Sequence, residues 1–194
     1  QAVQWFRKAA EQGNAWAQYQ LGECYYYGQG VEKDYAMAVQ WFRKAAQQGH
    51  ANAQNNLGVC CRNGIGVEKD PIQAVQWFRK GAELGDEEAR YWLGVCYYHG
   101  QGVEQDYTQA VEWFRKAAQQ GYAEAQYELG ECYYFGWGVE EDKPKAVQWY
   151  RKAADQGHKD AQRALADCYE NGRGVARDEA LAKEWRAKAK AKNF

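Results

Sequence analysis

The chain has 194 residues, 25 of them basic and 26 acidic, and its formal net charge is -1. Charges of both signs are interleaved, so the basic patch or stripe that binds nucleic acid or an anionic membrane is not expected. No apolar run approaches the roughly 18 residues that indicate a membrane span. Composition therefore favours a helical protein with no nucleic-acid partner and no membrane span, and the extended surface of the repeats described below favours a protein or a peptide as the partner.

A tandem repeat organises the whole sequence. Residues 35–70 and 107–142 are identical at 23 of 36 positions. A fixed period of about 20–50 residues is typical of arrays in which each repeat buries its apolar face against its neighbours. We therefore predict a single solenoid domain over residues 1–194, with a partial repeat 1–34, full repeats 35–70, 71–106, 107–142 and 143–178, and a partial repeat 179–194 as a C-terminal cap. Tryptophan marks the period at Trp5, Trp41, Trp77, Trp113, Trp149 and Trp185.

The first helix of each repeat, called helix A, has clear start and stop signals. In repeat 35–70, Trp41 and Phe42 belong to an apolar stripe with the spacing of a half-buried helix. Asp34 stands where an N-cap accepts a backbone hydrogen bond, and Gly49 follows the last apolar residue, where a left-handed cap favours glycine. Equivalent acids occur at Asp70, Asp106, Asp142 and Asp178, and equivalent glycines at Gly13, Gly85, Gly121 and Gly157.

A second helix, called helix B, completes each repeat. In repeat 35–70 its stripe includes Leu57 and Cys60 and ends at Gly64. Gly58 lies in the middle at a cost of about 1 kcal/mol relative to alanine, which predicts a close helix approach with no room for a side chain. A Gly-x-Gly-Val loop then leads to the next repeat. The predicted fold is all-α, a superhelical α/α solenoid of antiparallel helix pairs with a 36-residue period.

These motifs carry a resemblance to a known family. The pattern Leu-Gly-x-x-Tyr-x-x-Gly-x-Gly-Val-x-x-Asp, followed by Ala-x-x-Trp-Phe-x-Lys-Ala-Ala-x-x-Gly, resembles the Sel-one-like repeat (SLR) family, relatives of tetratricopeptide repeats, and it covers essentially the whole chain. The resemblance implies a right-handed superhelix of α/α hairpins and an adaptor role, generally without enzymatic activity. A cysteine-rich branch of the family joins helix A to helix B by a disulfide in each repeat, but helix A has no cysteine here.

The six cysteines are predicted to be small buried side chains on helix B. Equivalent cysteines of stacked repeats should lie about 8–10 Å apart, whereas a disulfide needs Cα atoms within roughly 7 Å. No Cys/His spacing of a metal site appears, so neither a metal nor a cofactor is expected. Reduced thiols are compatible with the cytoplasm, although the sequence assigns no localisation.

An enzymatic role is not expected from the residue types. The chain has no serine, and Thr108 is its one threonine. The Gly-x-Gly loops lack the Lys-Ser/Thr of a phosphate-binding loop. We therefore predict a protein without catalytic residues.

The residues that break the repeat pattern are the candidates for binding. The outer face of helix B should be polar, yet several repeats place aromatic side chains there, and such residues are enriched at protein interfaces. One alternative is that they pack between neighbouring repeats; another is that they stack on a small ligand or a cell-wall fragment, as in a binder or hydrolase. The predicted partner-binding residues are Tyr26, Tyr27, Tyr91, Trp92, Tyr98, His99, Tyr134, Phe135 and Trp137.

Two further surfaces are considered. Helix A carries a repeated Arg-Lys pair that forms a cationic ladder able to hold an acidic peptide, although a feature of every repeat also suits structural ion pairing. The chain begins within a repeat, so Trp5 and Phe6 are expected to have one open flank. That flank predicts self-association through this end, or further repeats before it. The ladder pairs are Arg7-Lys8, Arg43-Lys44, Arg79-Lys80, Arg115-Lys116 and Arg151-Lys152.

Overall fold

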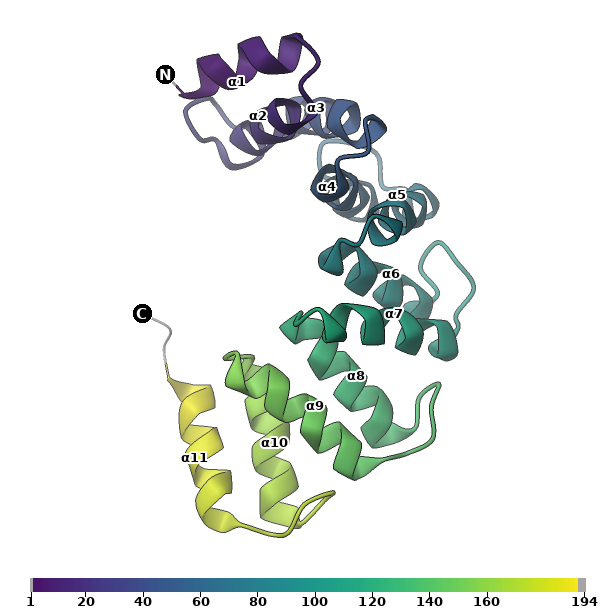
Figure 1. The fold of residues 1–194 in the computed structure, drawn as a ribbon, viewed down its shortest axis with the longest axis vertical. Helices are drawn as coiled ribbons and strands as arrows, with labels where there is room; N and C mark the ends of the chain where they lie inside the picture. Colours follow the sequence, from purple (N-terminus) through teal and green to yellow (C-terminus); the bar gives the residue numbers. More distant parts are fainter. Residues whose placement is uncertain (1, 192–194) are drawn as a thin grey trace. The chain divides into compact units, whose positions relative to one another are not determined.

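The computed structural model describes residues 2–191, and within that range the chain forms eleven α-helices and no strand (Figure 1). The helices fall into two compact units that meet in sequence between Gln105 and Asp106. The first unit contains α1 (Ala2–Glu11), α2 (Ala15–Tyr27), α3 (Tyr35–Gln47), α4 (Ala51–Asn63), α5 (Pro71–Glu83) and α6 (Glu87–His99). The second contains α7 (Tyr107–Gln119), α8 (Ala123–Phe135), α9 (Lys143–Asp155), α10 (Lys159–Asn171) and α11 (Glu179–Lys190).

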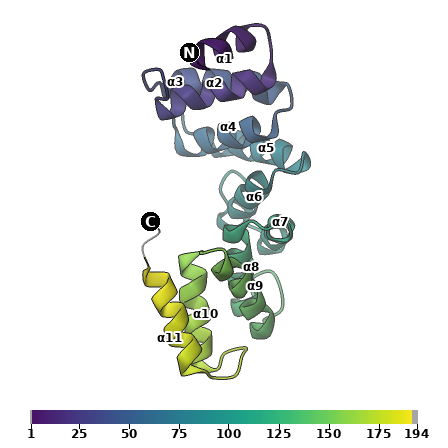
Figure 2. The ribbon, with the colours of Figure 1, turned by 60° about the vertical axis from the view of Figure 1, so that its left-hand side comes forward.

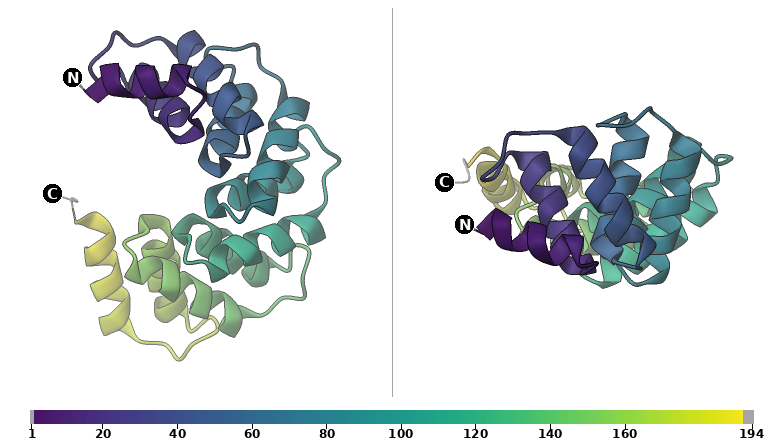
Figure 3. Two further views of the ribbon diagram at one scale, coloured as in Figure 1. Left: turned by 45° about the horizontal axis from the view of Figure 1, so that its top comes forward. Right: turned by 90° about the horizontal axis from the view of Figure 1, so that it is seen from above.

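Within each unit, helices that follow one another in the chain pack side by side. Odd-numbered helices are the A helices and even-numbered helices the B helices, and a B helix packs more extensively on the A helix after it than on the one before it. Figure 2 shows α10 and α11 side by side. Short links join A to B, and longer loops join B to A, as between α10 and α11 in Figure 3. The predicted all-α array of helix pairs is confirmed, whereas a single domain over residues 1–194 stays a prediction.

The predicted caps of the A helices are present. The Asp34 carboxylate accepts a hydrogen bond from the backbone N–H of Met37 at 2.9 Å, and Asp70 holds the start of α5 in the same way. Pro71 is the first residue of α5, where its missing N–H costs nothing. Gly49 follows α3 with a φ of +83°, a conformation that favours glycine. These local signals place the ends of the A helices without help from tertiary contacts.

The core of each unit lies between successive helices. Leu57 of α4 is fully buried, and a Cβ placed on Gly58 would lie 2.6 Å from two ring carbons of Phe78 on α5. The same approach occurs at Gly22 with Phe42 and at Gly130 with Tyr150. The predicted close helix approach is therefore confirmed at these three glycines.

The six cysteines are all free and buried, as predicted. Burial raises the pKa of the Cys60 and Cys132 thiols to about 12, so both stay protonated at neutral pH. Cys61 donates a hydrogen bond from its thiol to the Gln73 side chain at 3.2 Å. These residues contribute to packing between α4 and α5 and to the core of the second unit.

Two B helices begin with a histidine cap. Nδ1 of His50 accepts a hydrogen bond from the backbone N–H of Ala53 at 3.3 Å, and the imidazole stacks on the Tyr19 ring of α2 with a centroid distance of 4.6 Å. His158 repeats this arrangement at the start of α10, where it stacks on Tyr127. An imidazole nitrogen accepts a hydrogen bond only when it carries no proton, so both caps require neutral histidine.

Candidate functional site

The first unit divides the predicted aromatic residues between α2 and α6. On α2, the Tyr26 ring packs against Tyr35 and Phe42, with centroid distances of 5.1 and 6.3 Å, whereas Tyr27 is 57% exposed. Tyr26 therefore contributes to packing as well as to the surface, and Tyr27 is the more accessible of the two to a binding partner. On α6, the residues are Tyr91, Trp92, Tyr98 and His99, of which His99 is exposed and the others are partly buried.

Helix α4 interrupts the aromatic strip in this unit, because its outer face carries Asn56, Val59 and Arg62. A cavity of about 130 Å³ lies here, lined by Tyr26, Tyr27, Asn56, Val59 and Glu88. Arg62 lies over the Trp92 ring at 4.3 Å from the centroid and donates a hydrogen bond to Gln101. The strip is thus a mixed aromatic and polar surface in the first unit, which the repeat pattern alone did not reveal.

The second unit brings its three predicted residues together. Tyr134 packs edge-on against Phe135 at 4.8 Å between centroids, and Phe135 stacks on Trp137 at 4.7 Å. Phe135 remains 51% exposed. We call Tyr134, Phe135 and Trp137 the C-terminal aromatic cluster.

A cavity of about 250 Å³ adjoins this cluster, and we call it the anchor cavity. Ala164 of α10 forms part of its wall, at a helical position where the other B helices carry Gln20, Asn56, Trp92 and Glu128. The small side chain of Ala164 therefore explains why space opens at this place. Residues that line the cavity are Glu131, Tyr134, Phe135, Tyr150, Ala164, Asp167, Cys168 and Arg173.

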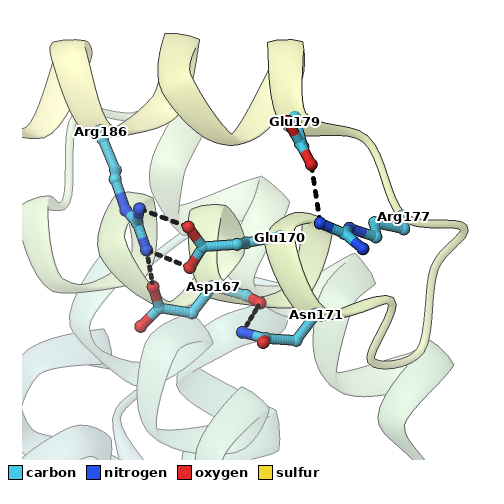
Figure 4. Close-up of polar contacts among 6 residues, drawn as sticks. All are labelled: Asp167, Glu170, Asn171, Arg177, Glu179 and Arg186. Carbon is cyan, nitrogen blue, oxygen red and sulfur yellow. Dashed lines mark hydrogen bonds and ion pairs between the residues drawn. The ribbon is translucent and has the colours of Figure 1, made fainter.

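Both carboxylates of the anchor cavity already have partners. The Tyr150 hydroxyl donates to Glu131 at 2.5 Å, and burial, together with this hydrogen bond, raises the pKa of Tyr150. Arg186 of α11 donates to Asp167 at 2.8 Å and to both oxygens of Glu170, which holds α11 on α10 (Figure 4). The hydrogen bonds of Glu131 and Asp167 are therefore made within the protein.

Arg173 is the cation of the anchor cavity. Its guanidinium donates a hydrogen bond to the Tyr134 hydroxyl at 3.0 Å, and it forms no ion pair with any carboxylate in the described part of the chain. Arg173 lies in the loop after α10, 39 positions from Tyr134. The sequence offered no signal that would pair these two side chains.

The cationic ladder of the A helices is engaged in structural contacts. Each ladder lysine lies over the tryptophan three positions before it, as Lys116 does over Trp113 at 3.9 Å from the ring centroid. Four ladder arginines donate to a tyrosine hydroxyl of helix B, and Arg43 is the exception because Cys61 replaces that tyrosine. These contacts favour the structural interpretation of the ladder over an acidic-peptide site. The pairs are Arg7–Tyr25, Arg79–Tyr97, Arg115–Tyr133 and Arg151–Tyr169.

One carboxyl group has a strongly altered acidity. Burial, followed by the charge of Glu131, raises the pKa of Glu128 to about 7. Glu128 lies on α8 but does not line the anchor cavity.

Two wider hollows of about 540 and 710 Å³ lie beside the loops before α9 and α3. They occupy equivalent places in two repeats, so we attribute them to the loop geometry.

The N-terminal end of the first unit exposes two tryptophans. Trp5 is 72% exposed and Trp16 is 56% exposed, whereas Trp41, the equivalent of Trp5, is 8% exposed because it packs against Ala10, Ala17 and Leu21. The Phe6 ring lies edge-on to Trp16 at 5.5 Å. The expected open flank of α1 is therefore present.

Residues 2–191 contain neither a metal-binding cluster nor a helix able to span a membrane. Residues 2–191 hold no group of three or more His, Cys, Asp and Glu side chains that could bind a metal ion. None of the helices in the described range combines the length and the apolar character that crossing a membrane requires.

Comparison with known proteins agrees with this architecture. The chain is similar to a solved protective antigen of uropathogenic Escherichia coli with an SLR fold, at 44% identity and a TM-score of 0.92, over 97% of this chain and 40% of that one. It is also similar to a Sel1 repeat protein from Oxalobacter formigenes, at 38% identity and a TM-score of 0.91, over 100% of this chain and 77% of that one. An immunity protein from Pseudomonas aeruginosa, Pa5087, is 28% identical with a TM-score of 0.61, over 96% and 72% of the two chains.

The family assignment rests on the repeats themselves. The comparison with curated proteins gives no match. Six segments match the Sel1 repeat, namely 1–14, 17–50, 51–86, 87–122, 123–158 and 159–194. The segments from residue 51 onward begin with a B helix and end after the following A helix, and in 51–86, 123–158 and 159–194 this is the pair that packs most extensively. The chain therefore belongs to the Sel1 repeat family, whose members are generally protein-interaction scaffolds.

Proposed function

We propose that this protein is a noncatalytic scaffold that binds a protein or peptide through the aromatic side chains of its B helices. The observation that carries the proposal is the C-terminal aromatic cluster, whose rings remain partly exposed beside an open cavity. The first unit adds Tyr27 and His99 on the same face of its own B helices. Exposed aromatic groups beside a cavity are typical of the anchor points of protein interfaces.

The exposed area is large enough to matter for binding. An aromatic side chain buries about 150–250 Å² when it is fully covered. Phe135 is 51% exposed, so a partner can cover about 100 Å² of it, and at ~25 cal/mol per Å² this corresponds to about 2–3 kcal/mol. The stacked Trp137 holds the Phe135 ring in place before binding, which lowers the entropic cost. This side chain is therefore our strongest candidate for a binding hot spot.

The noncatalytic part of the proposal has three supports. The thiols are buried and their pKa values are raised, as for Cys168 at about 11, so they are poor nucleophiles at neutral pH. The carboxyl groups with raised pKa values, Glu128 and Asp86, do not line either of the aromatic cavities. Those cavities, of about 130 and 250 Å³, are also smaller than the roughly 300–1,000 Å³ of common small-molecule sites, which disfavours the alternative of a small-ligand binder or hydrolase.

Selection of binding peptides tests the proposal. A displayed library of random linear peptides is selected on the purified protein, and the affinity of each recovered peptide is then measured by fluorescence polarisation. We expect Phe135→Ala to weaken binding by about tenfold or more, since about 2 kcal/mol of apolar contact is removed. Circular dichroism confirms that the variant keeps its helices.

The matched control is Ile72→Ala on α5. Ile72 is 62% exposed, so this variant removes a comparable apolar surface from an A helix. We expect it to leave peptide affinity unchanged. Equal affinity of the parent, Phe135→Ala and a Tyr27→Ala/His99→Ala variant would contradict a site on the B helices, and a selection that yields no binding peptide would contradict the peptide-binding function.

A further inference from the structure

We infer that the anchor cavity receives the C-terminal residue of a partner protein, with the apolar side chain of that residue inside the cavity and its α-carboxylate at Arg173 and Tyr134. The inference rests on the proposed scaffold function and specifies the chemistry of the partner. It follows from the shape of the cavity, from the pairing of its charges and from the short distance between its apolar and cationic parts.

The apolar part of the cavity lining suits an apolar side chain. It is formed by Ala164 and Cys168 of α10, Tyr150 of α9 and Phe135 of α8. A water molecule takes about 30 Å³ in the liquid, so 250 Å³ has room for a side chain of the size of leucine or phenylalanine. Release of water from such a wall favours an apolar ligand group.

The hydrogen-bond donors left in the cavity favour an acceptor at Arg173. Asp167 is bound by Arg186, and Glu131 accepts a hydrogen bond from Tyr150. These two carboxylates therefore have donors within the protein. Arg173 forms no ion pair within the described residues, and its bond to Tyr134 uses one of the five N–H donors of a guanidinium, so it can still donate to a carboxylate.

The contact between Arg173 and Tyr134 prepares a carboxylate site. Because Arg173 donates to the oxygen of Tyr134, the hydroxyl hydrogen of Tyr134 is directed to another acceptor. Lys143 adds positive charge nearby, since its ammonium group lies 5.7 Å from the centroid of the Tyr134 ring, although it also pairs with Glu141. A carboxylate can thus accept one hydrogen bond from the guanidinium and one from the phenol, the charge-assisted type that contributes most.

The closeness of the two parts points to a chain terminus. Arg173 lines the same small cavity as Ala164 and Cys168, so a single residue can place its carboxylate at Arg173 and its apolar side chain beside Ala164 and Cys168. In a C-terminal residue both groups are attached to the same Cα. A carboxylate on a neighbouring residue starts from a Cα about 3.8 Å away and, in an extended chain, points to the opposite side. An α-carboxylate therefore fits better than an Asp or Glu side chain.

Fluorescein-labelled hexapeptides test the inference directly. The set ends in Leu, Phe, Ala or Asp, and each peptide is made both as the free acid and as the C-terminal amide. We expect the Leu and Phe acids to bind the parent protein most tightly and their amides to bind about tenfold more weakly, because the charge-assisted hydrogen bonds are lost. This difference should shrink at high salt, which screens the carboxylate from Arg173.

Three variants separate the parts of the site. Arg173→Gln should remove the difference between acid and amide and keep the preference for Leu and Phe. Ala164→Trp introduces the tryptophan that α6 carries at the equivalent position, Trp92. This larger side chain should fill the cavity and abolish binding. The matched control is Arg177→Gln, which removes an exposed arginine of the same loop that pairs with Glu179 and does not line the cavity (Figure 4). It should bind like the parent.

The outcomes distinguish this inference from the scaffold function. Equal binding of acids and amides, an unchanged Arg173→Gln variant, or unchanged binding by a folded Ala164→Trp variant would each overturn the inference. If no free-acid peptide binds while peptides from the displayed library still bind through Phe135, the C-terminal residue is not the ligand and the scaffold function stands. If neither kind of peptide binds, the scaffold function fails as well.

Discussion

The ionised form of Glu128 should destabilise the fold, and Glu128→Gln should relieve that cost. Burial, followed by the charge of Glu131, raises the pKa of Glu128 from 4.5 to about 7. One pKa unit corresponds to ~1.36 kcal/mol, so keeping the carboxylate ionised in the folded chain costs about 1–3 kcal/mol. A glutamine of the same size removes the charge and leaves the packing of α8 in place.

The sign of the pH effect follows from the direction of the shift. The folded state binds the proton more tightly than the unfolded state, because the pKa of Glu128 is higher in the fold. The stability linked to this proton is therefore fully present below about pH 4.5 and is lost as the pH rises through about 7. Glu128→Gln should lack this dependence, so its advantage over the parent should be largest under alkaline conditions.

Urea unfolding followed by circular dichroism measures the effect. The parent and Glu128→Gln are compared at about pH 8.5, above the folded pKa of Glu128, and at about pH 4, below its unfolded pKa of 4.5. We expect the variant to be more stable by about 1–3 kcal/mol at the higher pH and by less than about 0.5 kcal/mol at the lower one. Glu124→Gln, which alters an exposed glutamate of the same helix, is the control. Parallel stability curves for the parent and Glu128→Gln would refute the reasoning.

Three further predictions concern the caps, the core and the open end. Burial lowers the pKa of His50, so the stability that its neutral imidazole gives by capping Ala53 is present above about pH 6.5 and is lost as the pH falls. His50→Asn should keep this cap, which is worth about 1 kcal/mol, and urea unfolding should show no loss of it at low pH. Gly58→Ala should destabilise by about 1–3 kcal/mol in the same assay, because its Cβ would lie 2.6 Å from the buried Phe78 ring. Trp5 is 72% exposed, so sedimentation velocity should show self-association that rises with concentration and is abolished by Trp5→Lys.

Each of these predictions has its own control. His50→Ala removes the cap altogether and should lower stability at every pH, and an acid-sensitive His50→Asn protein would count against the cap as the source. The control for Gly58→Ala is Ala166→Gly, because Ala166 occupies the equivalent position on α10 and Arg186 stands there in place of the Phe78 ring. Ala166→Gly should destabilise the fold by about 1 kcal/mol through helix propensity alone. A stabilised Gly58→Ala protein would show that the ring moves aside. A parent that sediments as a single monomer at all concentrations would contradict association through Trp5.

The sequence predicted the helices well because the signals that bound them are local. Asp34 caps α3 through a backbone N–H three positions away, and Gly49 ends it through a conformation of its own backbone. Both effects act within one helical turn, so the pattern predicts them without knowledge of the neighbours. Even Gly58, whose role is a tertiary contact, was predictable because a glycine recurs at the equivalent position of other repeats, as Gly22 and Gly130.

The histidine caps show a limit of this approach. His50 and His158 are two of three widely spaced histidines, and their residue type alone does not indicate a helix cap. They occupy the position where α2 has Asn14 and α6 has Asp86 as caps, and this equivalence was the signal that could have revealed their role. Their stacking on Tyr19 and Tyr127 depends on the preceding B helix, which only the structure displays.

The candidate site was predicted in part. Tyr134, Phe135 and Trp137 were chosen because they break the repeat, and the structure shows the three rings in contact. Their role in binding stays a prediction. The sequence does not indicate Ala164 or Arg173 as site residues, since an alanine on a helix and an arginine in a loop are common.

The sequence by itself determined the repeat, the ends of its helices and the identity of the residues that depart from it, because period, caps and glycine conformation act over short distances along the chain. Only the tertiary structure decided which of these residues border a cavity and which contact other side chains. The four ladder arginines are engaged because a tyrosine of the following B helix reaches them, whereas Arg173 donates to a phenol and forms no ion pair within residues 2–191. Pairings of this kind join residues from different helices, so no short-range pattern along the chain specifies them.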